Sequence, residues 1–208
     1  MEVFFHFPTT ALGWVLNIVF GGIGAVLLMS FVEIILHGYF MHTRFLPAWV
    51  YRRVPYLERA VLEHNDLHHT KYYVQFDRED DPYGKNLNLK IHPPIVLVGI
   101  IGVAPIYAYV ATLSSSVPYI VFILVVTLHM FAWNLIHTEM HQPRHPWWSK
   151  TGTFKFLARY HYLHHHHIRN HGGKNFNVVV PFWDFVLGSS STHVEGTELE
   201  LDRLGYLA

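Results

Sequence analysis

Three long apolar stretches divide the chain. The first runs from Ala11 to Leu36, and its only charged residue is Glu33. At about 1.5 Å of rise per residue, a helix of this length crosses a bilayer core of about 30 Å. Two further runs, from Ile95 to Leu113 and from Val117 to Ile136, are separated only by a short serine turn, 114–116. This pattern predicts transmembrane helices over about 11–36, 95–113 and 117–136, the last two forming a hairpin.

The polar segments, 37–94 and 137–208, are predicted to form one helical cap on the cytoplasmic side. All fifteen Lys and Arg residues lie in them, between Arg44 and Lys90 and between Arg144 and Arg203. The positive-inside rule therefore places the N-terminus and the serine turn on the opposite side. A signal peptide is disfavoured for the first run because it has no basic segment before it and no small-residue cleavage site. We expect an all-α, multi-pass integral membrane protein with a single domain over 1–208.

Finer features of the pattern give weaker expectations. The segment 47–63 mixes apolar residues with arginines, as in helices that lie along a membrane surface, and 77–84 is a polar loop. Gly21-Gly22-Ile23-Gly24 lies inside the first span, where small residues favour close helix packing rather than phosphate binding.

Composition narrows the possible chemistry. Hydrophobic residues make up 51% of the chain, charged residues 14%, and the formal net charge is zero, so no charge imbalance favours nucleic acid. The absence of cysteine excludes disulfides, thiolate ligands and iron–sulfur clusters. Imidazole is left as the characteristic ligand.

Histidine is abundant, and ten of the eighteen histidines fall into four clusters at the cytoplasmic ends of the spans or just beyond them. Residues three or four apart share a helix face, which pairs His64 with His68, His137 with His141, and His161 with both His164 and His165. Ten imidazoles exceed the needs of one ion and predict two metal ions with four or five nitrogens each. The predicted ligands are His37, His42, His64, His68, His69, His137, His141, His161, His164 and His165.

The first cluster has the least suitable spacing, because residues five apart in an α-helix differ by about 140° of turn. We expect the helix end to unwind at Gly38 so that His37 and His42 converge. Glu33, one turn before His37, is a candidate to orient its imidazole. Other candidates to hold the second nitrogen of a ligand are Asp66, Glu139 and Asp184, with ordinary capping or ion-pair roles equally open for each.

Eight histidines remain outside the predicted ligand set. For five of them an interfacial or hydrogen-bonded role is favoured over metal binding, although His129 shares a face with His137 and is placed to line a cavity above the metals. These five are His6, His92, His129, His145 and His193. The run that ends the fourth cluster leaves His166, His167 and His171 open as solvent-facing or supporting residues.

The four clusters occur in the order HxxxxH, HxxxHH, HxxxH and HxxHH. After them come Asn175-Phe-Asn177 and then residues 182–189, Phe-Trp-Asp-Phe-Val-Leu-Gly-Ser. Over about residues 30–190 this arrangement resembles the fatty acid hydroxylase (sterol desaturase) superfamily of membrane di-iron enzymes. Its first and third boxes are similar to those of sphingolipid fatty-acyl 2-hydroxylases. The string Ile136-His-Thr-Glu139 and the spacing from the last box to Asn175 are more similar to those of alkylglycerol monooxygenase. The chain departs from those relatives in having three residues before the second His pair, as acyl desaturases do, and Asn-Phe-Asn where they carry Asn-Tyr-Gly or Gly-Phe-Gly.

The resemblance implies two iron ions, with O2 as co-substrate, and a membrane lipid, fatty acyl or sterol-like substrate. Attack on an unactivated C–H bond itself requires a redox metal, and hydroxylation is the expected reaction. A desaturase, a carotenoid hydroxylase and a non-enzymatic membrane metal-binding protein are the alternatives, and zinc can replace iron in a purified sample. Because the sequence has no flavin, nicotinamide or haem fingerprint, an external cytochrome or ferredoxin with its reductase is expected to supply electrons. Lys174, Asn175 and Asn177 are candidates to anchor a substrate head group.

Overall fold

The computed structural model describes residues 7–86, 115–145, 147–170 and 173–206, with isolated positions between 97 and 109. Within these residues the regular elements are helices, and the one β-type pairing is an isolated bridge between Gln75 and Arg78. The expected all-α class is therefore confirmed at this level. The predicted span over 95–113 lies almost entirely outside the described residues, as do His6, His92 and His171.

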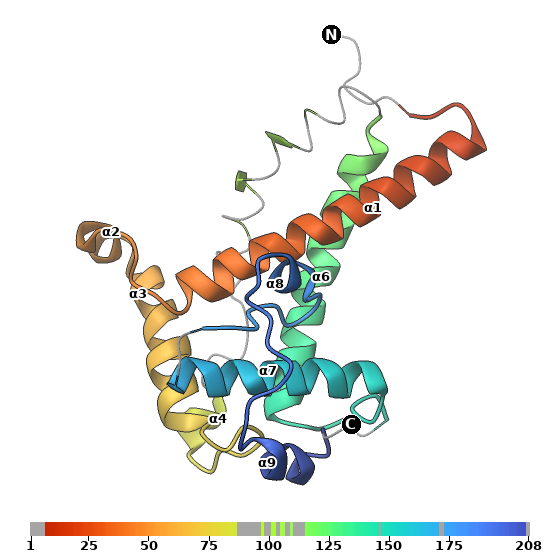
Figure 1. Cartoon of the computed structure of the whole chain (residues 1–208). Helices are drawn as coiled ribbons and strands as arrows, with labels where there is room; N and C mark the ends of the chain where they lie inside the picture. Colours follow the sequence, from red (N-terminus) through yellow and green to blue (C-terminus); the bar gives the residue numbers. More distant parts are fainter. Residues whose placement is uncertain are drawn as a thin grey trace.

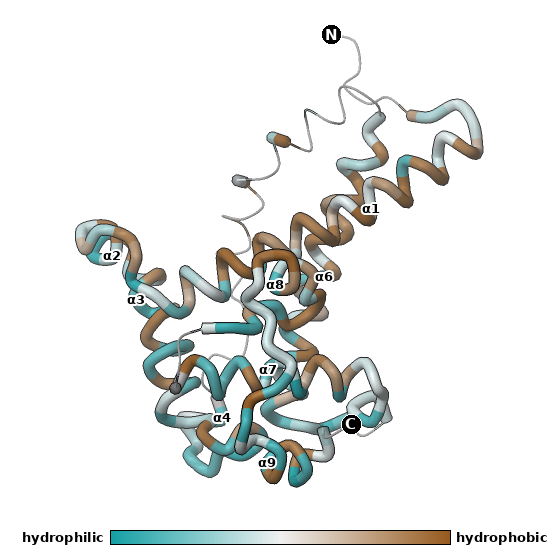
Figure 2. The backbone as a smooth tube through the Cα atoms, in the orientation of Figure 1, coloured by the Kyte–Doolittle hydropathy of each residue, from teal (hydrophilic) through white to brown (hydrophobic). Residues whose placement is uncertain are grey.

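Within the described residues, two helices are long and apolar enough to cross a membrane, Ala11–Phe40 and Val117–His141. The first consists of α1 (Ala11–Glu33), which continues into the π-helix η1 (Ile34–Phe40), and the second is α6 (Val117–His141). Thr10 begins α1 by accepting a hydrogen bond from Gly13 N at 3.1 Å. Both helices extend past the apolar runs, so they carry the first and third histidine clusters into the polar half of the molecule (Figures 1 and 2).

The two long helices pack against each other with their N-terminal ends together (Figure 1). At that end Ser115 Oγ donates to Asn17 Oδ1 at 2.7 Å, and toward the other end His129 Nε2 lies 3.1 Å from Glu33 Oε2. A Cβ on Gly21 would lie 3.1 Å from the Cα of Pro118, so the glycine permits close approach of the backbones, as the sequence indicates. The two helices therefore run parallel.

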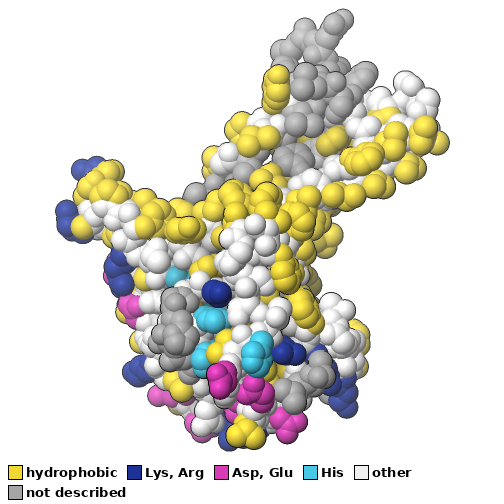
Figure 3. All heavy atoms as spheres, viewed as in Figure 1, with side chains coloured by type: hydrophobic (Ala, Val, Ile, Leu, Met, Phe, Trp, Pro, Cys, Tyr) yellow, Lys and Arg dark blue, Asp and Glu magenta, His cyan; other side chains and the backbone are white. Residues whose placement is uncertain are grey.

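Most of the remaining described helices form the polar half of the structure (Figure 1). They are α2 (Ala48–Arg53), α3 (Pro55–Val61), the π-helix η2 (Leu62–Tyr72), α4 (Pro82–Asn86), α7 (Gly152–Asn170) and α9 (Glu198–Arg203). The short α8 (Phe182–Val186) lies beside α1 instead. The segment 47–63 is helical as expected, whereas the predicted loop 77–84 includes the start of α4. In Figure 3 charged side chains gather on this half and at the tip of α2, while hydrophobic ones cover the long helices.

Candidate metal centre

The ten predicted ligands converge into two groups of five buried imidazoles. Within each group the ligand nitrogens lie within 4.8 Å of one another. Set A comprises His37, His42, His64, His69 and His164, and set B comprises His68, His137, His141, His161 and His165. Their rings meet as well, since those of His69 and His165 are 3.9 Å apart between centroids. Each set can hold one metal ion, which is consistent with the dimetal site expected from the sequence.

The pairing within the clusters differs from the one that α-helical periodicity predicts. His64 joins His69 in set A rather than His68, and His161 joins His165 in set B while His164 belongs to set A. The physical reason for the first change is η2, a π-helix whose five-residue repeat brings His64 and His69 to one side, with their Nε2 atoms 3.2 Å apart.

The same π-helical geometry resolves the first cluster. Instead of unwinding at Gly38, the chain widens into η1, and Met41 N donates to Leu36 O at 3.0 Å across five residues. His37 and His42 therefore reach the same set. Gly38 has another role, because a Cβ there would lie 3.2 Å from the ring of Phe176. Set A is thus built on two π-helices, whereas set B takes i, i+4 pairs from α6 and α7.

The distances between ligand nitrogens match a shared ion. His37 and His64 approach to 2.9 Å through their Nε2 atoms, and the Nε2 atoms of His141 and His161 approach to 3.2 Å. Nitrogens bound at about 2.1 Å to one ion lie about 3.0 Å apart at right angles and about 3.4 Å apart in a tetrahedron.

Hydrogen bonding within set A favours a cation. His42 Nδ1 lies 3.1 Å from Asn65 Oδ1, and His164 Nδ1 lies 2.6 Å from the carbonyl oxygen of Lys174. Both Nδ1 atoms face acceptors and so carry the proton, which leaves a lone pair on each Nε2 of the neutral rings. These two Nε2 atoms are only 3.1 Å apart. Two lone pairs at this distance repel each other, and a metal ion between them would bind both.

The imidazoles are held neutral, as ligands must be. Burial lowers the pKa of His42 from 6.5 to about 3. Burial, followed by repulsion from neighbouring imidazoles, also holds the pKa values of six other ligands well below the usual range, namely His64, His68, His69, His161, His164 and His165. The set therefore presents lone pairs at physiological pH.

Backbone carbonyls, rather than the predicted carboxylates, orient several ligands. His37 Nδ1 donates to Phe176 O at 2.5 Å, and His141 Nδ1 donates to Phe76 O at 2.6 Å. With Lys174 O and Asn65 Oδ1, these acceptors fix which nitrogen faces the metal. The sequence does not indicate which backbone carbonyl will accept a hydrogen bond from a ligand imidazole. Asn65 was detectable in principle, because it follows His64 directly.

The three predicted carboxylates serve the surrounding structure. Asp66 pairs with Arg44 at 2.9 Å and accepts from Asn65 Nδ2, so it acts on His42 only through that amide. Glu139 accepts from the backbone amide and ring of His145 at 2.6 and 2.7 Å. Asp184 accepts from Asn177 N and Ser189 Oγ within the closing segment. Each carboxylate therefore has ion-pair or hydrogen-bond partners of its own, the alternative role that the sequence left equally open.

Glu33 also differs from its expected role. Its Oε1 accepts from the backbone amides of Val178 and Val179, and its Oε2 faces His129 and Asn177. It therefore fixes the segment that follows Phe176, whose carbonyl orients His37. His129 is buried against Glu33.

The Asn-Phe-Asn motif is structural. Asn175 has a φ of 58°, a left-handed conformation that Asn tolerates, and its amide donates to Tyr160 O and Ser191 O. Asn177 donates to Ser30 O at 2.7 Å. Both side chains are buried and take part in these hydrogen bonds, which hold the closing segment in place. The turn at Asn175 lets the flanking carbonyls of residues 174 and 176 reach His164 and His37, whereas the side chain of Lys174 is exposed.

The other described histidines lie outside both sets. His145 contacts Glu139, and His193 lies 3.7 Å from Glu198. His166 and His167 continue α7 beyond the two ligands but join neither group.

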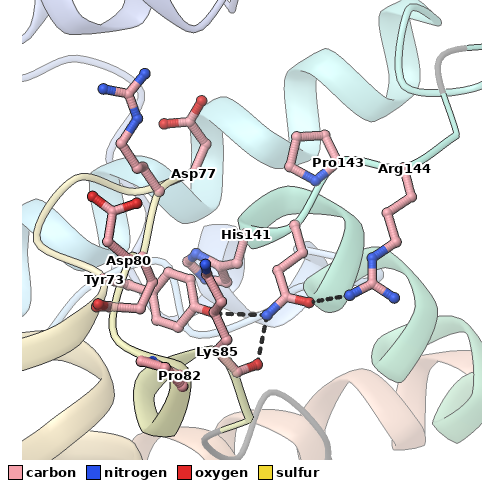
Figure 4. A pocket seen from close by; sticks show the side chains of 11 residues that line it. Tyr73, Asp77, Asp80, Pro82, Lys85, His141, Pro143 and Arg144 are labelled. Atoms are coloured by element: carbon pink, nitrogen blue, oxygen red, sulfur yellow. Dashed lines mark hydrogen bonds between the residues drawn. The ribbon is translucent and has the colours of Figure 1, made fainter.

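A polar pocket of about 640 Å³ adjoins set B (Figure 4). Its wall includes His141 and Tyr73, whose rings are 4.8 Å apart between centroids, and the Tyr73 hydroxyl accepts from Gln142 Nε2 at 2.8 Å. Charged side chains, among them Asp77, Lys85 and Arg144, line the rest. The pocket thus reaches the outer side of set B at His141, whose own side chain is buried.

Comparison with known proteins gives no match: no family model, no curated protein and no solved structure matches the chain. The candidate function therefore depends on the geometry and the residues alone.

Proposed function

We propose that the chain is an O2-dependent dimetal oxygenase of the membrane that hydroxylates a long-chain fatty acyl, lipid or sterol-like substrate. The observation that carries the proposal is the pair of neutral five-imidazole sets, buried at the ends of two apolar helices long enough to cross a bilayer. Two irons bound there would supply activation of dioxygen for attack on a C–H bond.

The chain's own residues provide three conditions for such a reaction. They hold the ligand imidazoles neutral and oriented, through the carbonyls of residues 76, 174 and 176. They keep all ten imidazoles out of water, which protects a reactive site from side reactions. They also separate an apolar side, along α1 and α6, from the polar pocket beside His141.

This separation of an apolar side from a polar side matches the two kinds of reactant, an apolar substrate and protons. Conversion of R–H and O2 to R–OH and water consumes two electrons and two protons. An apolar substrate would approach from the lipid side, and the pocket beside His141 and Tyr73 would admit protons. Electrons would come from an external cytochrome or ferredoxin partner with its reductase.

The helix directions support a third span between the two described ones, and the positive-inside rule supports a cytoplasmic site. Because α1 and α6 run parallel, a chain that crosses the membrane in both must cross back between them. The apolar run 95–113 is about 28 Å long as a helix, enough for that crossing. Single cysteines at positions 52, 115 and 155 of this cysteine-free chain test the topology with an impermeant thiol reagent. Labelling from outside intact cells is expected at 115 only, and labelling at 155 would overturn the cytoplasmic placement.

Lipid mass spectrometry under 18O2 tests the reaction. Cells that express the wild-type chain are compared with cells that express His164→Ala, and with His193→Ala as a control that leaves both sets intact. A lipid that gains one 18O atom only with wild type and control supports hydroxylation. A loss of two hydrogens identifies a desaturase, an 18O-labelled carotenoid identifies a pigment hydroxylase, and no O2-dependent change favours a metal-binding protein without this activity.

A further inference from the structure

Helix α8 exposes an apolar surface that the proposed reaction does not use. Three of its five side chains and the residue after it are strongly exposed, with Phe182 at 41%, Phe185 at 52%, Val186 at 56% and Leu187 at 54%. The only charged residue between 178 and 188 is Asp184, which is buried. Such a surface requires an apolar partner.

The position of α8 indicates what that partner is. Trp183 Nε1 donates to Leu27 O of α1 at 2.7 Å, and its ring meets Phe31 edge-on at 5.3 Å between centroids. Leu27 and Phe31 precede His37 by ten and six residues, or about 15 and 9 Å along the helix. Helix α8 therefore lies beside the inner part of the candidate span rather than beneath it (Figure 1).

We propose that α8 is inserted into the lipid leaflet that surrounds α1. Its exposed side chains continue the apolar surface of that helix, which carries Phe20, Ile23 and Phe31 exposed as well. A second copy of the chain is disfavoured as the occupant, because three side chains on α8 and one directly after it fall far short of the roughly 1,200 Å² that a stable interface buries.

Insertion has a consequence for the metal centre. The segment that leads into α8 provides the carbonyls of Lys174 and Phe176 to set A, and Val180 O accepts from Ser30 Oγ at 2.6 Å. One short stretch thus joins the leaflet to the ligands of set A. The inference rests on the proposed membrane location but not on the proposed reaction.

Nitroxide labels on single cysteines test the insertion in lipid nanodiscs. The variants are Val186→Cys on α8, Phe20→Cys on the exposed face of α1, and Leu199→Cys on α9, where the side chain is 87% exposed. Collisions with O2, which concentrates in lipid, are compared with collisions with a water-soluble nickel chelate. Position 186 is expected to resemble position 20, with strong O2 and little nickel broadening, and position 199 to show the reverse.

The outcomes separate the two proposals. Nickel broadening at 186 equal to that at 199, with position 20 protected, overturns the insertion of α8 alone. Nickel broadening at position 20 as well would remove the membrane location itself. A label at 186 shielded from both reagents would mean coverage by protein, and would also overturn the inference. Metal content of two ions per chain checks folding, and Leu187→Cys replaces any variant that fails this check.

Discussion

Removal of two histidines from η2 is predicted to change the metal content in a way that depends on which two are removed. We compare His64→Ala/His69→Ala, which removes two ligands from set A, with His64→Ala/His68→Ala, which removes one from each set. If His64 paired with His68, as α-helical spacing predicts, the two variants would exchange their results.

The size of the effect follows from the ligand number. Four-ligand zinc sites have apparent binding free energies of about 10–16 kcal/mol, or about 2.5–4 kcal/mol per ligand. Loss of one of the five imidazoles in a set should then weaken binding roughly 100- to 1000-fold, at about 1.4 kcal/mol per tenfold. Loss of two should empty that set.

The assay is the metal-to-protein ratio by elemental mass spectrometry, after dialysis against a chelator at a concentration that leaves two ions in the wild type. His64→Ala/His69→Ala should retain one ion, and His64→Ala/His68→Ala should retain none. His193→Ala should keep both. One ion in the second variant together with none in the first would refute the assignment of ligands to the two sets.

Three further predictions concern the surroundings of the ligands. Glu33→Ala leaves the buried amide of Val178 and the half-buried amide of Val179 without their acceptor, at a cost of about 1–3 kcal/mol for the buried one. It should weaken ion binding roughly 10- to 100-fold at set A alone. Equal affinities of mutant and wild type in a chelator titration would contradict its positioning role. Gly38→Val should destabilise the fold by about 1–3 kcal/mol, because the new side chain would collide with the ring of Phe176. The thermal midpoint should fall accordingly. Gly152→Ala, which has open space around it, should leave the midpoint unchanged. The metal-free protein should lose stability as the pH falls from about 6.5 to about 3. The reason is that the pKa of His42 is 6.5 in the unfolded chain and about 3 in the folded one, so only the unfolded chain takes up the proton in this range. A thermal midpoint that stays constant over this range would refute the neutral state of the buried imidazoles.

The sequence predicts the helical class and the ten converging residues because both depend on local features. Apolar runs long enough to span a bilayer identify α1 and α6. Clustered histidines are costly to bury unless they share a common ligand, so their spacing alone indicates that they converge. The sequence predicted two ions with four or five histidines each, but it did not predict correctly which histidine belongs to which ion. Which member of His68 and His69 belongs to which ion depends on the widening of η2, and its residues do not differ visibly from those of an α-helix.

The surroundings of the ligands were predicted less well for a related reason. Carboxylates near the clusters were natural candidates as partners for imidazole nitrogens, yet the main chain at residues 76, 174 and 176 provides them. Every residue has a carbonyl, so only the folded path of the chain selects one. Glu33 illustrates the same limit, since its acceptor atoms meet residues about 145 positions later in the chain.

The absence of carboxylate and thiolate ligands determines how the site would respond to electron transfer. Ten neutral imidazoles bring no negative charge to two cations, and Glu33 and Asp184, both buried nearby, are engaged in hydrogen bonds to the closing segment. Removal of an electron from either ion would add positive charge that no ligand offsets, so the lower oxidation state is favoured. If the proposed redox metals are bound there, a high reduction potential is the expected result, and a mild donor would keep them reduced.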